Sequence, residues 1–288
     1  MTENQLKASE QLSGEDWAGE MGNRWLANLD YFEQMIAPIG KALVERALFQ
    51  SGERVIDIGS GGGVTTREVA RIVAPEGEVL GLDVAPMLVA EAEKRRAEAS
   101  IGNARFICAD ASTFRLKEPL FDRLVSRFGS MFFAEPSAAF ANLKDLIKAK
   151  SRIDLAVWGP PSENPWMMEM MSVVRRHIEV PPADPRAPGP FAFGDLDYLN
   201  HTLASGGFQD VQIDPYIGKQ AIGGAELTTI EVLDFVLSSL GVGRILDEAS
   251  EAIRTKASED LLLLFENHFS PGSGVVMNCK AWLVSARS

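Results

Sequence analysis

The sequence predicts an α/β fold in which a mostly parallel sheet carries helices, and three observations support this. An apolar run at residues 55–58 leads straight into a glycine cluster, and apolar residues then recur at helical spacing over residues 65–74. A strand, a glycine turn and a helix in this order open a nucleotide-binding βαβ unit. Two more short apolar runs follow, with Asp83 and Asp110 at their ends. The chain therefore alternates strands and helices, as a parallel sheet requires.

The bulk properties fit a globular protein that acts on small molecules. The 288 residues suit one large domain, or one domain with an appendage, and 46% of them are hydrophobic. The net charge of −12 disfavours nonspecific binding to nucleic acid or to an anionic membrane, because the long-range field has the wrong sign. We therefore expect a small-molecule substrate, no nucleic-acid partner and no membrane partner.

The composition also predicts a cytoplasmic protein. The first thirty residues carry acidic side chains and no apolar block, so we expect no signal peptide. No apolar stretch of about 18 residues occurs, so we expect no membrane-spanning helix. Cys108 and Cys279 each lie in a predicted apolar strand, which predicts two buried free thiols and a reducing compartment.

Residues 1–50 are expected to form an N-terminal helical cap segment. After a polar start the pattern turns helical, and a second helix is predicted from Pro38 to Phe49. The first helix carries an apolar stripe, which either packs in the core or closes Trp17 or Trp25 over a ligand. This stripe consists of Trp17, Met21, Trp25, Leu29 and Phe32.

The glycine cluster indicates which ligand the pocket holds. Its glycines stand at Gly59, Gly61 and Gly63, and Val64 occupies the place where a dinucleotide fingerprint has its third glycine. Asp57 precedes the first glycine at the carboxyl edge of the strand. Such a carboxylate would repel a pyrophosphate and favour a positively charged ligand. S-adenosylmethionine, which carries an ammonium group, a sulfonium and no phosphate, meets this requirement.

The next two strands each end beside an acid. Residues 79–83 form the second strand, and Asp83 at its end can accept hydrogen bonds from both hydroxyls of a ribose. A helix over residues 86–100 follows. The third strand, residues 103–108, leads to Asp110, which is also a candidate N-cap for a short helix.

Residues 57–63, followed by Asp83, Asp110 and the strand exit at residues 126–133, resemble the motifs of class I S-adenosylmethionine-dependent methyltransferases. The strand exit is similar to that of the bacterial group related to ubiquinone and menaquinone biosynthesis. The resemblance implies a Rossmann-like, seven-stranded, mostly parallel sheet with an antiparallel last strand and helical cap elements. It also implies that Asp110 hydrogen-bonds the adenine amino group. The cofactor-binding residues that it implies are Asp57, Gly59, Ser60, Gly61, Gly63, Asp83, Val84, Met87, Asp110, Ala111 and Ser126.

The second half of the chain is expected to complete the sheet and to cover its edge. The cofactor-binding core spans residues 51–160. Residues 161–194 are rich in proline and methionine, and they predict an irregular lid over the substrate or a loop that packs on the core. Residues 195–288 form the remainder of the core, with a helical insertion at about 218–274. The strands predicted after the third one are residues 121–126, 152–158, 211–213 and 279–286.

The resemblance implies direct methyl transfer to an acceptor O, N, C or S atom, catalysed mainly by proximity and orientation. The apolar, aromatic character of the predicted lid suggests that the acceptor is a small, apolar or aromatic molecule. His177, in the predicted lid, is the candidate general base for a hydroxyl acceptor. Trp25, Arg127 and Trp166 are the candidate substrate residues, and Arg127 either binds a substrate carboxylate or pairs with a core acid. No metal ligand is expected.

Two alternatives of other classes remain open. An NAD(P)-dependent oxidoreductase should have a complete glycine fingerprint and no acid at position 57. A noncatalytic S-adenosylmethionine-binding protein would share every motif, since a sequence does not prove turnover. The predicted assembly is a monomer or a homodimer.

Overall fold

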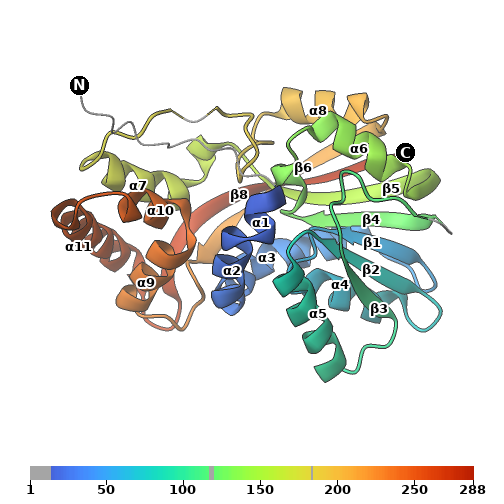
Figure 1. Cartoon of the computed structure of the whole chain (residues 1–288), viewed down its shortest axis with the longest axis horizontal. Helices are drawn as coiled ribbons and strands as arrows, with labels where there is room; N and C mark the ends of the chain where they lie inside the picture. The colour runs from blue at the N-terminus through green and yellow to red at the C-terminus, as the bar shows by residue number, and fades with distance from the viewer. Residues whose placement is uncertain (1–13, 117–119, 183) are drawn as a thin grey trace.

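The computed structural model describes residues 14–116, 120–182 and 184–288, and it contains one twisted sheet flanked by helices (Figure 1). Seven strands follow the order β3-β2-β1-β4-β5-β8-β6, and the short strand β7 pairs with β8 alone. Strands β1 to β5 pair in parallel, whereas β8 is antiparallel to both β5 and β6. The predicted fold class is confirmed. The strands are β1 Arg54–Ile58, β2 Glu78–Asp83, β3 Ala104–Cys108, β4 Phe121–Arg127, β5 Ile147–Trp158, β6 Gln209–Ala221, β7 Phe269–Ser270 and β8 Gly274–Arg287.

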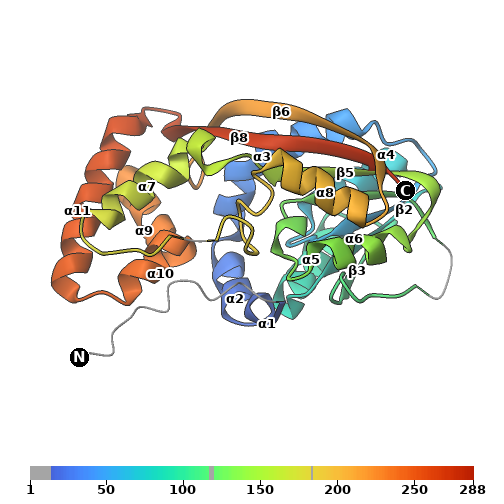
Figure 2. The ribbon, with the colours of Figure 1, turned by 90° about the horizontal axis from the view of Figure 1, so that it is seen from above.

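Helices cover both faces of the sheet and extend beyond one of its ends. Helices α3, α4 and α5 lie on one face, and α6 and α8 lie on the other (Figures 1 and 2). The helices are α1 Gly14–Ala18, α2 Glu20–Ala27, α3 Leu29–Ala47, α4 Val64–Val73, α5 Pro86–Glu98, α6 Pro136–Lys144, α7 Pro165–Arg175, α8 Leu196–Ser205, α9 Thr229–Ser239, α10 Gly241–Asp247 and α11 Glu251–His268. Two short 3₁₀ turns are η1 Ser130–Phe132 and η2 Pro161–Glu163.

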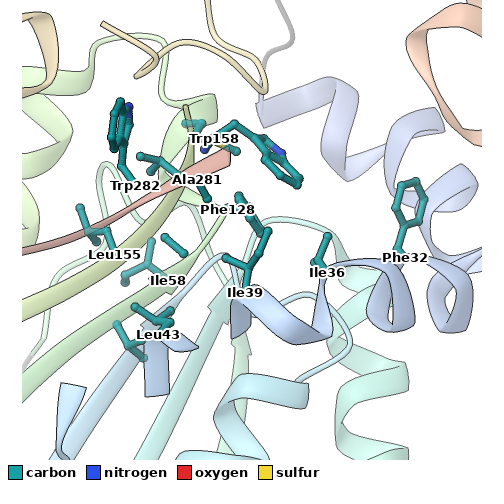
Figure 3. Packing of buried hydrophobic residues seen from close by; sticks show 14 of the residues in the cluster. Phe32, Ile36, Ile39, Leu43, Ile58, Phe128, Leu155, Trp158, Ala281 and Trp282 are labelled. Atoms are coloured by element: carbon teal, nitrogen blue, oxygen red, sulfur yellow. The ribbon is translucent and has the colours of Figure 1, made fainter. Parts of the chain in front are cut away.

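The expectation that a second helix begins at Pro38 is wrong, because α3 runs from Leu29 through Pro38 to Ala47. Proline removes one backbone donor, which would have bonded the carbonyl of Gln34 four residues earlier. Both residues are exposed, so water can hydrate that carbonyl and the helix continues. One face of α3 packs on the sheet, and in Figure 3 Ile39 lies next to Phe128 of the β4 exit.

Helices α7, α9, α10 and α11 form a cap beyond the sheet, which appears on the left of Figure 1. The carboxyl end of β5 leads into α7, and the carboxyl end of β6 leads into α9. Because β5 and β6 point the same way, the cap stands at the edge where parallel strands end and where such sheets bind ligands. The insertion between β6 and β8 leaves the sheet at Ala221, which pairs with Val276.

Two further expectations are corrected by the structure. The predicted lid is not wholly irregular, because α7 occupies its first third and buries Trp166 and Met170. Cys108 is a free thiol, as predicted, but it is exposed rather than buried. It is the last residue of β3, one of the two outermost strands, and its Sγ lies 3.5 Å from the carbonyl oxygen of Val84. Cys279 is free and buried, as predicted.

Candidate functional site

The glycine turn between β1 and α4 lies against the exit of β4. Gly59 has a φ of +67°. A Cβ added to it would lie 2.6 Å from the Cα atom of Gly129, which follows β4. The two backbones therefore touch, and neither position accepts a side chain without a shift. This contact brings the carboxyl ends of β1 and β4 together at the edge that also receives the cap.

Gly129→Ala should lower the free energy of unfolding by about 1–3 kcal/mol, the usual cost of overpacking. The new Cβ would lie 2.6 Å from the carbonyl oxygen of Ile58 and 2.7 Å from the Cα atom of Gly59. Gly102→Ala is the matched control, because nothing lies within 4 Å of its added Cβ. Urea denaturation measures both variants, and equal stabilities would contradict the close packing.

Asp83, at the end of β2, is tied to the glycine turn. Its carboxylate accepts hydrogen bonds from the N–H of Gly61 at 2.7 Å and from the N–H of Ala85 at 2.9 Å. Burial raises the pKa of Asp83, while these backbone donors lower it. The carboxylate thus stands beside the central glycine of the turn, where ribose recognition was predicted. Val84 is half-buried beside it, and the Met87 sulfur lies against α2 near Gly22.

Asp57 is only 1% exposed and does not reach the open surface of the turn. The hydroxyl of Thr66 donates to its carboxylate at 2.6 Å. Burial raises the pKa of Asp57 to about 6, although Thr66 and the nearby Arg127 act in the opposite direction. In this conformation Asp57 can act on a bound cation through its field rather than by contact. Thr66, in the first turn of α4, was not singled out in the sequence.

The other predicted cofactor residues serve local structure. Asp110 is exposed and accepts hydrogen bonds from the N–H and the hydroxyl of Ser112, at 2.8 and 2.7 Å. A turn follows it, not the expected short helix. Ser126 donates to the carbonyl of Ile58 at 2.8 Å and so joins β4 to β1. Ser60 and Ala111 are buried, and the adenine and methionine contacts of all these residues stay predictions.

Arg127, at the end of β4, is neutralised inside the protein. Its guanidinium forms an ion pair with Glu33 of α3, and the two side chains are 8% and 11% exposed. It also lies against Gly40, where an added Cβ would be 3.0 Å from its Cδ. The sequence left two partners open for Arg127, a substrate carboxylate or a core acid, and the described contacts agree with the core acid. Glu33 precedes Arg127 by 94 residues, so no local sequence pattern indicated that the two would pair.

An aromatic row extends from the exit of β4 into the lid. Phe128 stacks on Trp158 at 4.4 Å between ring centroids, Trp158 lies 5.1 Å from Trp166, and Trp166 lies 6.5 Å from Phe191. Figure 3 shows Phe128 beside Trp158 at the end of β5. The φ of Phe128 is +63°, which is a rare conformation for a bulky residue and is typical of functional sites. Trp166 thus belongs to a buried aromatic row that begins at the exit of β4.

A second aromatic row belongs to the N-terminal helices. Trp17 of α1 contacts Phe132 of η1 edge to face at 4.9 Å and Trp25 of α2 at 5.8 Å. Trp25 stacks on Phe32 at 3.7 Å. The Nε1 atom of Trp25 is 4.0 Å from the position that a Cβ of Gly61 would take. Trp25 therefore lies over the glycine turn. From the sequence, Phe132 was included only as part of the strand exit at residues 126–133.

His177 lies in the cap and is engaged with α11. Its Nε2 is 2.9 Å from a carboxylate oxygen of Asp260. A second pair of the same kind joins His268 of α11 to Glu169 of α7 at 2.8 Å. The second pair joins α7 to α11, and the first joins the segment just after α7 to α11. The role of His177 as a general base stays a prediction. Nothing in the sequence pattern pointed to Asp260 as its partner.

Within the described ranges, no group of three or more His, Cys, Asp or Glu side chains could hold a metal ion. Among the described helices, none is both long and apolar enough to cross a membrane.

Comparison with known proteins relates the chain to methyltransferases. Residues 55–150 match the family described as "Methyltransferase domain". The aklanonic acid methyltransferase DauC of Streptomyces sp. is 31% identical over 120 residues, which cover 42% of this chain and 54% of that protein. The ubiquinone/menaquinone biosynthesis C-methyltransferase UbiE of Pseudomonas aeruginosa is 31% identical over 122 residues, covering 42% and 48%. The chain thus spans about half the length of these curated relatives.

Solved structures share the fold at lower identity. Phosphoethanolamine N-methyltransferase 2 of Haemonchus contortus, solved with phosphomonomethylethanolamine and S-adenosylhomocysteine, has a TM-score of 0.58 at 15% identity, covering 96% of this chain and 60% of that one. The YcgJ protein of Bacillus subtilis has a TM-score of 0.54 at 17% identity, covering 86% and 97%.

Proposed function

We infer, from the match of residues 55–150 to the family described as "Methyltransferase domain", that the protein transfers a methyl group from S-adenosylmethionine to a small, neutral, apolar or aromatic molecule. The observation that carries the proposal is the pairing of Asp83 with the glycine turn, through the N–H of Gly61 at 2.7 Å. A carboxylate on the central glycine amide suits ribose hydroxyls and opposes a pyrophosphate, which would need that amide for itself.

The residues present fit S-adenosylmethionine. Asp57 and Asp83 put two acids beneath and beside the turn, which favours a cationic ligand. Gly61 leaves the backbone open to close approach, because only the Nε1 atom of Trp25, at 4.0 Å, lies near the position that its Cβ would take. We propose that Asp83 holds the ribose, that Asp110 and Ala111 receive the adenine, and that Trp25 covers the cofactor from α2.

The aromatic rows support an apolar or aromatic acceptor. Both rows meet the chain where β4 ends: Phe128 stacks on Trp158 beside Trp166, and Phe132 contacts Trp17. The nearby Arg127 is already paired with Glu33, so it offers no free charge to an acidic substrate. The name of the relative UbiE points to quinone precursors, which agrees with this class, whereas the name of DauC points to an acid, aklanonic acid, for which the paired Arg127 offers no free charge.

The chain's own contribution to catalysis would be positioning. S-adenosylmethionine, when bound, supplies an activated methyl group on a sulfonium that leaves as a neutral thioether. Because the leaving group is built into the cofactor, holding the acceptor in line and excluding water supply most of the rate. The walls of the two aromatic rows orient a planar acceptor, and α1 with α2 covers the turn. His177 would act as a base only if the cap brings it to the acceptor.

Calorimetry with S-adenosylmethionine and with NAD tests the proposal. We expect S-adenosylmethionine and S-adenosylhomocysteine to bind at micromolar concentrations and NAD not to bind. Tight binding of NAD alone would favour the oxidoreductase alternative. A methyl-transfer assay with radiolabelled cofactor and a panel of phenols, quinols and polyketide acids then separates an enzyme from a noncatalytic binding protein.

We also propose that the protein works in the cytoplasm, as a monomer or homodimer, on a small molecule rather than on nucleic acid. Its two free cysteines and its net charge of −12 support this setting.

A further inference from the structure

Helices α1 and α2 lie across the cofactor site from β2 to β4. Gly22 of α2 packs on the start of α5, where its added Cβ would lie 3.0 Å from the Met87 sulfur and 3.1 Å from Ala85. Trp25 lies over Gly61, and Trp17 contacts Phe132 beyond β4. Figure 1 shows α1 and α2 between α5 and the cap. Along these helices Trp25 therefore lies next to the glycine turn, and Trp17 lies next to the segment that follows β4.

The indole N–H of Trp17 is buried and has no hydrogen-bond partner among the described residues. An indole nitrogen can only donate, so nothing but an acceptor atom satisfies it. The comparable indoles of Trp166 and Trp282 both have partners, at 3.1 Å on Asn164 and at 3.4 Å on the carbonyl of Gly194. A phenylalanine would fill the same aromatic row without the cost of a buried, unpaired donor.

We propose that the N–H of Trp17 donates a hydrogen bond to a neutral oxygen of the methyl acceptor, a carbonyl or a phenolic oxygen on an aromatic ring, and so selects the acceptor. This inference rests on the proposed function. Trp17 packs against Phe132, which follows the carboxyl end of β4, whereas Trp25 is the indole that lies next to the glycine turn. The oxygen is neutral because Arg127, the cation at this strand end, is paired with Glu33.

The experiment uses the full chain saturated with S-adenosylhomocysteine and two probes of the same ring system. 1-Tetralone carries one ketone oxygen, and tetralin carries none. Ligand-observed NMR should show that the wild type binds tetralone about 2- to 12-fold more tightly than tetralin, the range for one neutral hydrogen bond. In Trp17→Phe the ring contacts remain, and the two probes should bind equally.

Three other results would overturn the inference. The first is that Trp17→Phe keeps the preference for tetralone, and the second is that the wild type binds neither probe. The third is that Trp17→Phe weakens S-adenosylhomocysteine binding, which would assign the N–H to the cofactor instead. Titration with S-adenosylhomocysteine also checks that the variant is folded. If the wild type itself fails to bind S-adenosylhomocysteine, the proposed function fails, and this result is distinct from the other three.

Discussion

Replacing Asp83 by alanine should weaken the binding of S-adenosylmethionine by about 5- to 150-fold, which corresponds to about 1–3 kcal/mol. The carboxylate accepts the N–H groups of Gly61 and Ala85, so its removal leaves two donors of the turn without their partner. It also removes the group that would accept the ribose hydroxyls. Isothermal titration calorimetry with S-adenosylmethionine measures the change directly.

Asp122→Ala is the matched control for this experiment. Asp122 also accepts a backbone N–H, that of Arg54 at 3.0 Å, but it lies at the opposite end of the strands. Both variants should lose stability in urea, whereas only Asp83→Ala should lose affinity. If Asp83→Ala binds the cofactor as tightly as the wild type, the carboxylate does not hold the ribose.

Asp57→Asn should stabilise the protein at neutral and alkaline pH while weakening its hold on a cationic cofactor. Burial raises the pKa of Asp57 from 3.8 to about 6, so the folded state binds a proton more tightly than the unfolded chain. Raising the pH from about 4 to 6 therefore removes stability, and above pH 6 the loss is constant. It amounts to about 3 kcal/mol at pH 8 and to less than about 1 kcal/mol at pH 4.

Asparagine removes the titrating charge and keeps an oxygen that can accept the hydroxyl of Thr66. The gain in the free energy of unfolding should therefore grow with pH, which urea titrations at pH 4 and pH 8 compare. Calorimetry should show weaker S-adenosylmethionine binding at pH 8, because the field of Asp57 is gone. An equal gain at both pH values would contradict the raised pKa, and unchanged affinity would contradict its role toward the cation.

Local sequence patterns predicted the parts of the site that are contiguous in the chain. The turn at residues 59–63 directly follows its strand, and Asp83 ends the next one, so spacing alone placed both at one edge. The pairing of Arg127 with Glu33 and the clamp of His177 by Asp260 join residues 94 and 83 positions apart. No periodicity in either segment encodes such partners.

Element lengths were the least predictable feature, because tertiary contacts set them. Strand β6 runs from Gln209 to Ala221, although only residues 211–213 were expected. Pro215 and Gly218 interrupt its pattern, yet an outermost strand tolerates both because one of its edges needs no hydrogen-bond partner. Helix α7 was not predicted, because the prolines around it made the segment resemble an irregular loop.

The insertion that carries α9 to α11 enters and leaves the sheet at paired positions, Ala221 and Val276. Paired positions on antiparallel strands are only about 5 Å apart, a gap that a tight turn of two residues can close. The segment can therefore be lengthened, shortened or exchanged without changing the register of the sheet or the turn at residues 59–63. A scaffold built in this way allows the cap to diverge among descendants while the sheet and its glycine turn are inherited intact.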